Sequence, residues 1–354
     1  MATIPTLPAA TYKMDTMFTT SWFEMQKKAI DNILTANVFS AALKSNGCFT
    51  KQTGGRHIER TLRYGTKTAI AVQKGDTLPT GEDEIETAAL WDLKTLTVHV
   101  QRSLQDDQAN SGPAARKSLV ETKLSAARDA LEAKFEAALL ADVDTTDSRT
   151  DNRAVEDPYS IGNIIPVTTA GTLGVPSCIY TGQTVGDYTY GNVDTGTVNT
   201  WWTHIGQTAN APFLMNMLTD MRTLYNYCTK GSSDHPNLIL MVQAQYEAYE
   251  DLCATNIQLV QDVGSPLAKL GYDVMKFKGA QIIWDPSATW RAATIGMLNT
   301  DHLEVVYDPG LWFQMTPWMF LENQFERIAR IICSFSGLIC TQLRRQGCTG
   351  EYGS

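Results

Sequence analysis

Hydrophobic residues follow their longest regular pattern between residues 114 and 141. They recur at steps of three and four, which places them on one face of an α-helix: Val120, Leu124, Ala127, Leu131, Phe135 and Ala138. Ser111-Gly112-Pro113 precedes the segment, and proline suits the first turn of a helix. The pattern therefore predicts one helix of about 28 residues, about 42 Å long, that can brace the whole fold.

A shorter helix is expected near the N-terminus. Residues 1–20 are rich in proline and threonine without periodicity, which is typical of an extended arm. Ser21 with Glu24 forms a capping-box pattern that starts a helix, and Asn46-Gly47 is a suitable end for it. We expect this helix to run from Ser21 to about Ser45.

Residues 48–100 change to the alternating pattern of β-strands. His57–Tyr64 forms one strand, which Ala69–Val72 continues, and Trp91–Val100 forms the return strand. The apolar phase of the return strand changes near Lys94-Thr95, which predicts a bulge or a change of packing surface. A polar segment, KGDTLPTGEDEIET, lies between the arms. The two strands and the polar segment together predict a hairpin that is too long to lie entirely within one buried sheet.

The rest of the chain predicts an α+β fold. Residues 142–157 are acidic and rich in turn-forming residues, and residues 158–210 are poor in charge and rich in glycine and threonine. Helices are expected at Phe213–Lys230 and Gln243–Cys253. The expected strands are Leu238–Val242, Gln281–Trp284, Ile295–Leu298 and Leu303–Tyr307, with a last hairpin of Phe325–Phe335 and Leu338–Leu343 about Ser336-Gly337.

The two arms of the long hairpin differ in charge. The first arm is mostly basic and the return arm is acidic, and the candidate contact residues are Arg56, Arg60, Arg63, Lys67, Lys74, Glu82, Asp83, Glu84 and Glu86. One interpretation is a solvated hairpin whose arms neutralise each other. The other is an arm that lies across a neighbouring molecule, with its charges fixing the register. Composition alone leaves both open.

Overall composition narrows the possible functions. The chain of 354 residues has a net charge of −9, which argues against a protein that grips nucleic-acid phosphates. Its seven cysteines lack a C-x-x-C pair, so we expect reduced thiols, mostly small core residues. No signal-peptide pattern is present, and the apolar stretch Ile328–Cys340 contains Arg330 and is too short to span a membrane. We expect a soluble protein without membrane contact.

No motif for catalysis or cofactor binding stands out. The five histidines lie far apart without metal-ligand spacing, and there is no G-x-S-x-G, Walker or G-x-G-x-x-G motif. Asp142, Asp144 and Asp147 alternate, but no glutamate follows at the distance that a calcium loop requires. We therefore expect no metal, no cofactor and no enzymatic activity. A metal-independent hydrolase is kept as the competing class.

The order of these elements resembles the major capsid proteins of tailed bacteriophages, the Hong Kong 97-type fold. The resemblance rests on several stretches in order: GGRHIERTLRYG and TAALWDLKTLTVHVQRS on the hairpin, QDDQANSGPAA before the long helix, then HPNLILMVQAQYEAYEDL, LGYDVMKFKGAQIIWD, GMLNTDHLEVVYDPG and NQFERIARIICSFSGLICTQLRRQG. Together they cover most of residues 45–350.

The resemblance implies a division of the chain into five parts. These are an N-terminal arm and helix (1–47), an extended β-hairpin or E-loop (48–102), a spine helix with the loop-rich part of a peripheral domain (103–210), an axial domain with flanking strands (211–320), and a closing peripheral hairpin with the C-terminus (321–354).

The resemblance also implies a function in assembly. Hexamers and pentamers of the chain would close into an icosahedral head that encloses double-stranded DNA without sequence-specific contacts, within a virion assembled in the host cytoplasm. A portal is an expected partner. Some members carry a cleaved N-terminal scaffolding domain, and since only about 47 residues precede the hairpin here, a separate scaffolding protein or none is expected. The alternatives are an encapsulin-like compartment and a tail or decoration protein.

Some members of this family join a hairpin lysine covalently to an asparagine of a neighbouring subunit. Lys67 and Lys74 lie on the hairpin here, and Asn299 and Asn323 lie late in the chain. Nothing in the sequence pairs them.

Overall fold

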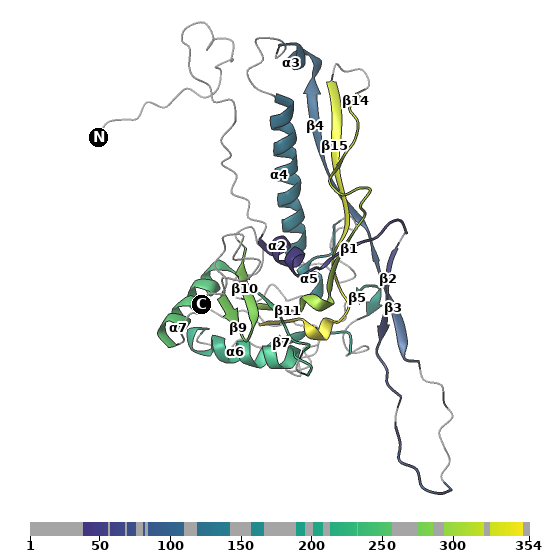
Figure 1. Cartoon of the computed structure of the whole chain (residues 1–354), viewed down its shortest axis with the longest axis vertical. Helices are drawn as coiled ribbons and strands as arrows, with labels where there is room; N and C mark the ends of the chain where they lie inside the picture. The colour runs from purple at the N-terminus through teal and green to yellow at the C-terminus, as the bar shows by residue number, and fades with distance from the viewer. Residues whose placement is uncertain are drawn as a thin grey trace, which may run out of the picture.

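The protein is elongated, with a long blade, a compact unit at one end of the blade and a hairpin that projects past that unit (Figure 1). The computed structural model describes residues 38–55, 57–67, 69–75, 81, 84–109, 119–141, 157–165, 189–194, 201–207, 213–231, 233–256, 275–285, 294–321 and 326–349. All structural statements below concern these ranges.

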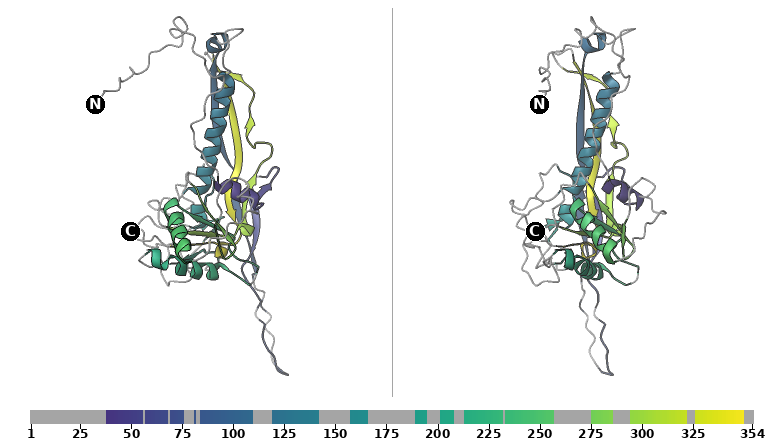
Figure 2. Two further views of the ribbon diagram at one scale, coloured as in Figure 1. Left: turned by 60° about the vertical axis from the view of Figure 1, so that its left-hand side comes forward. Right: turned by 90° about the vertical axis from the view of Figure 1, so that its left-hand side faces the viewer.

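The blade is a helix laid along a sheet. Helix α4 (Leu119–Leu140) runs beside two long antiparallel strands, β4 (Lys94–Ser103) and β15 (Glu326–Cys340), as the views in Figure 2 also show. The shorter strands of this sheet are β1 (Phe49–Lys51), β12 (Leu303–Tyr307), β13 (Gln314–Met315) and β14 (Met319–Phe320), and α3 (Leu104–Ala109) follows β4. The predicted apolar stripe of α4 is confirmed where it is described, because Ala127, Leu131, Phe135 and Ala138 are buried.

The compact unit is built on a second six-stranded sheet of order β7-β16-β11-β8-β10-β9. Its strands are β7 (Ile205–Gln207), β8 (Leu238–Met241), β9 (Met275–Phe277), β10 (Ala280–Trp284), β11 (Gly296–Leu298) and β16 (Gly347–Thr349). The helices α6 (Phe213–Cys228) and α7 (Gln243–Asn256) belong to it. Short elements complete the fold: α2 (Val38–Ser45), α5 (Ile161–Ile164), the strand pair β5 (Thr189–Tyr190) and β6 (Val193–Asp194), and the 3₁₀ turns η3 (Thr300–His302) and η4 (Leu343–Arg345).

The second sheet is buried on both faces. Ile239 and Met241 of β8 lie in a core with α6 and α7, whereas Leu238 and Leu240 lie in the core of the blade. Successive residues of a strand point to opposite faces. All four residues of β8 are apolar because each face of the strand packs against a different core. The blade and the compact unit thus share one sheet between two cores.

The predicted hairpin at Ser336-Gly337 is wrong, because β15 continues through these residues with only a shift of register against β12. It pairs with β4 over Glu326–Phe335 and with β12 from Phe335 to Cys340. Gly337 has φ +86, and a Cβ atom at this position would lie 2.1 Å from the carbonyl oxygen of Tyr159. Tyr159 donates its N–H to Ser336 O and accepts from Leu338 N. The glycine marks a place where the backbone of Tyr159 pairs beside the strand in a single parallel bridge, not a turn.

Gly337→Ala should therefore lower the free energy of unfolding by more than about 3 kcal/mol, since the added methyl group collides with backbone and the left-handed φ is unfavourable. Gly231→Ala is the matched control, because Gly231 has φ +74 and open space around it. It should lose only about 1–2 kcal/mol. Urea unfolding measures both, and equal losses would show that the close bridge to Tyr159 is not a constraint.

The N-terminal end of α2 joins the blade to the compact unit through two buried carboxyl groups. Phe39 N–H donates to Glu136 of α4 at 2.8 Å and to Asp285, which follows β10, at 3.2 Å. Ser40 N–H also donates to Glu136, at 3.1 Å. Burial, followed by the hydrogen bond to Asp285, raises the pKa of Glu136 to about 8, against the opposing effect of Ser40. A protonated Glu136 can thus share its proton with the Asp285 carboxylate.

This buried proton makes stability depend on pH. The native chain holds it up to about pH 8, whereas unfolded Glu136 releases it near 4.5. The proton therefore contributes fully to the free energy of unfolding below pH 4.5, and this contribution is lost as the pH rises through 8. Glu136→Gln keeps the shape and a donor for Asp285, so its free energy of unfolding should fall less between these pH values than that of the parent. Exposed Glu132→Gln, one turn earlier, should follow the parent profile, and identical profiles for all three proteins would refute the shared proton.

Candidate functional site

The projecting hairpin consists of β2 (His57–Arg63), β3 (Glu86–Asp92) and the residues between them. The ladder runs from the His57–Asp92 pair to the Arg63–Glu86 pair, and Tyr64 and Gly65 each donate an N–H to Ile85 O. At its root, Ile58, Leu62, Ala89 and Trp91 are buried in the core of the blade. The root therefore belongs to the body, and the part beyond Gly65 and Ile85 extends away from it (Figures 1 and 2).

Close packing fixes the direction of the hairpin root. The Trp91 ring meets Tyr190 edge-to-face at 5.7 Å, and a Cβ atom at Gly191 would lie 2.7 Å from the Trp91 ring. The Tyr190 hydroxyl donates to Leu338 O at 3.2 Å and accepts from Cys340 N at 2.8 Å. These bonds attach Tyr190 to β15, and Trp91 of the hairpin root packs on Tyr190. The body therefore sets the orientation of the projecting part.

The predicted change of packing surface near Lys94-Thr95 is confirmed. Strand β3 ends at Asp92 and β4 begins at Lys94. The partner changes at the same place, from β2 to β15.

The predicted strand at Ala69–Val72 is wrong, because these residues have no strand partner among those described. Ile70 and Val72 are 49% and 50% exposed. Their alternating apolar pattern predicted that these two side chains are buried, but the described part of the chain does not cover them.

The structure separates the predicted contact residues into two groups. Arg60 forms a two-nitrogen ion pair with Glu304 of β12, at 2.8 and 3.2 Å, within its own chain. Exposed Arg63, Lys67, Lys74, Glu84 and Glu86 form no ion pair among the residues described. Arg63 does lie opposite Glu86 in the ladder. Arg56, Glu82 and Asp83 lie outside the described residues.

Glu304 is the partner of Arg60 that sequence reasoning missed. A signal was present, because Arg60 interrupts the apolar face that carries Ile58 and Leu62. A charged residue in that phase must face the body and find a partner there. The structure supplies that partner from β12.

Other candidate chemistry finds no support within the described ranges. No group of three or more His, Cys, Asp or Glu side chains could hold a metal ion there, and no helix there is long and apolar enough to cross a membrane. Asp142, Asp144 and Asp147 lie outside those ranges. The described cysteines are buried core residues, as expected: Cys48, Cys228, Cys253, Cys333, Cys340 and Cys348.

Asn299 is an internal structural residue. It is fully buried, its side-chain amide donates to Asp234 at 2.7 Å, and its backbone N–H donates to Gln346 at 2.9 Å. These contacts do not present it to a neighbouring subunit. Asn323 lies outside the described residues.

The sequence matches no protein-family model and no curated protein. Solved structures, however, match it along nearly its whole length. The capsid of cyanophage A-1(L) aligns with a TM-score of 0.61 at 14% identity, covering 93% of this chain and 97% of that one. The capsid of a native GTA particle gives 0.58 at 9% identity, covering 94% and 96%. The holo-SrpI encapsulin complex from Synechococcus elongatus PCC 7942 gives 0.52 at 11% identity, covering 98% and 99%.

The chain has the Hong Kong 97-type fold. This confirms the expected α+β class and fold type. At identities of 9% to 14% the likeness establishes the fold alone. The division into arm, E-loop, peripheral and axial domains at the expected residue boundaries stays a prediction, and so does a contact of the exposed hairpin charges with a neighbour.

Arg60→Glu should destabilise the isolated chain by about 1–3 kcal/mol, because it replaces a partly screened ion pair by repulsion from Glu304. Adding Glu304→Arg should recover most of the loss. Lys67→Glu, an exposed reversal on the same arm, should stay within about 0.5 kcal/mol of the parent. Chemical unfolding of the unassembled chain tests this, and equal losses for Arg60→Glu and Lys67→Glu would contradict it.

Proposed function

We propose that this chain is the major capsid protein of a tailed-phage type of particle. Hexamers and pentamers of it would close into an icosahedral shell around double-stranded DNA. The observation that carries the proposal is the agreement with capsid structures over more than nine-tenths of this chain and of those chains. A fold shared over that extent supports assembly into a shell of the same kind.

The hairpin supports a role in assembly. Its root is fixed in the body, while Ile70 and Val72 near its tip stay about half exposed. Exposed apolar side chains on a projecting element favour association with another molecule. When a contact joins two different surfaces of identical chains, repeated contacts produce a closed ring if the rotation from one subunit to the next divides a full turn. Such a ring is the geometry of a capsomer.

The charge of the chain suits a container for DNA. With a net charge of −9, the subunit would not bind packaged DNA through release of counterions, as a basic lining would. We place the protein in the virion, assembled in the host cytoplasm with a portal and a scaffolding protein as partners. The role proposed is structural and not enzymatic.

An encapsulin-like compartment is the second candidate, since the holo-SrpI encapsulin complex matches 98% of this chain. The content of purified shells separates the two. Nuclease-protected DNA supports a capsid, whereas an enclosed protein without DNA supports a compartment. A tail or decoration protein would form tubes or rings in negative stain instead of polyhedral shells.

Removing residues 66–84, with Gly65 joined to Ile85, tests the role of the hairpin. The ends are suited to joining, because Gly65 already donates its N–H to Ile85 O, and the buried residues of β2 and β3 are kept. The variant should unfold at the same urea concentration as the unassembled parent but form no closed particles in electron micrographs.

Ala69→Ser, an exposed change in the same segment, is the control and should assemble like the parent. Closed particles of normal size from the deletion variant would contradict an essential role for the hairpin.

A further inference from the structure

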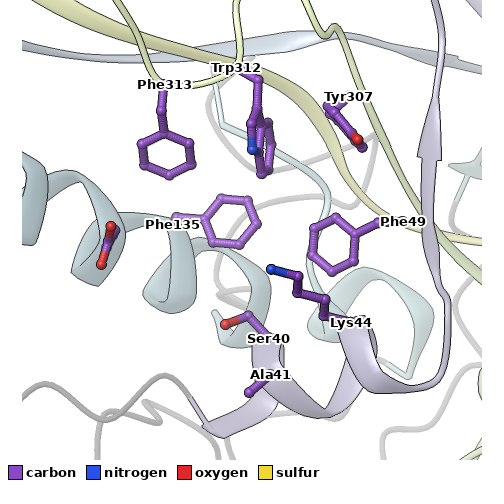
Figure 3. Close-up of a pocket in the computed structure, with 9 residues that line it drawn as sticks. Ser40, Ala41, Lys44, Phe49, Phe135, Tyr307, Trp312 and Phe313 are labelled. Carbon is purple, nitrogen blue, oxygen red and sulfur yellow. The ribbon is translucent and has the colours of Figure 1, made fainter.

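A pocket of about 510 Å³ opens between α2, α4 and the loop that follows β12 (Figure 3). Its volume falls in the range of about 300–1,000 Å³ that is typical of small-molecule sites. Lys44 of α2, Phe49 of β1, Glu132 and Phe135 of α4, and Trp312 and Phe313 of the loop line it. The assembly proposed above does not involve this pocket.

Aromatic rings form the walls of the pocket, and Trp312 is central among them. Its ring centre lies 5.7 Å from that of Phe135, 6.2 Å from that of Phe49, 5.1 Å from that of Phe313 and 4.5 Å from that of Tyr307. Phe135 is buried, whereas the other rings are only partly buried. Rings that keep accessible area around a concave surface favour an apolar group that packs among them.

Contacts outside the pocket hold these walls in place. Hydrogen bonds close the loop that carries Trp312, because Ser334 N–H donates to Leu311 O and Leu311 N–H donates to Asp308 O, each at 3.1 Å. Phe313 has a φ of +50, which is unfavourable for a bulky residue and is found where the surroundings demand it. The pocket is therefore formed before a ligand arrives, which lowers the entropic cost of binding.

Two exposed charges of opposite sign line the opening. Lys44 and Glu132 form no ion pair with each other or with any other residue described. Ser40 N–H donates to Glu136 at 3.1 Å where α2 meets α4. Lys44 lies four residues after Ser40, and Glu132 lies four residues before Glu136. Since residues four apart share a helix face, both charges lie beside this helix contact.

This combination of charges restricts what the pocket can bind. Figure 3 shows the Lys44 side chain extending over the pocket toward the aromatic rings. An organic cation among the rings would attract Glu132 but be repelled by Lys44, and an apolar carboxylate would attract Lys44 but be repelled by Glu132. A molecule with an ammonium and a carboxylate at one end and a large apolar group at the other matches both charges and the walls.

We propose that the pocket binds a free α-amino acid with a large apolar side chain. Its carboxylate pairs with Lys44, its ammonium pairs with Glu132, and its side chain lies among the aromatic rings. The site lies within one chain, so the inference goes beyond the proposed shell function and does not depend on it. Because the ligand contacts both α2 and α4, its binding stabilises the junction of α2 with the blade.

Four probes, added to the unassembled chain, test which groups the pocket recognises. L-Phenylalanine carries the ammonium, the carboxylate and the apolar group, whereas 3-phenylpropionate lacks the ammonium, 2-phenylethylamine lacks the carboxylate and glycine lacks the apolar group. Isothermal titration calorimetry should show phenylalanine binding about tenfold or more tighter than each of the others, since each missing group removes a charged hydrogen bond or apolar burial. No saturable binding of phenylalanine, or equal binding of all four probes, would overturn the proposal.

Single substitutions assign each charge to its partner on the ligand. Lys44→Gln should abolish the preference for phenylalanine over 2-phenylethylamine, because that preference comes from the carboxylate. Glu132→Gln should abolish the preference over 3-phenylpropionate, because that preference comes from the ammonium. Both residues are exposed, so both variants should unfold at the same urea concentration as the parent.

Lys134→Gln is the matched control, because Lys134 is an exposed residue of α4 that does not line the pocket. It should bind all four probes like the parent. Preferences that survive unchanged in Lys44→Gln and Glu132→Gln would show that phenylalanine binds elsewhere, and they would overturn the assignment of this pocket.

Discussion

The architecture depends on one long strand that stays continuous where its surroundings change. Strand β15 pairs with β4 along the blade and then with β12 near the compact unit, and Tyr159 forms a parallel bridge with Gly337 through two backbone hydrogen bonds. Only glycine fits at that bridge, because a Cβ atom would lie 2.1 Å from the Tyr159 oxygen. The cores of the blade and of the hairpin root both rest on this strand, through Phe135 against Phe335 and through Tyr190 against Leu338.

The hairpin divides into an anchored half and an exposed half, and this division suits assembly. Trp91 and Ile58 are buried to 1% and 0% exposure, whereas Ile70 and Val72 remain about half exposed. A rigid root gives the tip a defined direction, so that less order has to be gained when it binds a neighbour. The Arg60–Glu304 ion pair belongs to the anchored half, while Lys74 and Glu84 belong to the exposed half.

Local elements were predictable from the sequence because they depend on local chemistry. The apolar stripe of α4, the ends of β12 and the change of phase before Lys94 follow from periodicity within one segment. Gly337 was misread as a turn because its constraint comes from Tyr159, far away in sequence. Ala69–Val72 was misread as a paired strand because its apolar residues lack a partner within the chain. Glu304 and the aromatic pocket were missed because separate elements bring their residues together.

Assembly of many copies of this chain into a closed shell can be observed directly by electron cryomicroscopy of the purified, unmodified protein. We expect closed polyhedral particles in which the hairpin of each subunit lies on the body of the next. Chains that remain monomeric at high concentration, or closed shells in which every hairpin projects into solvent, would contradict it.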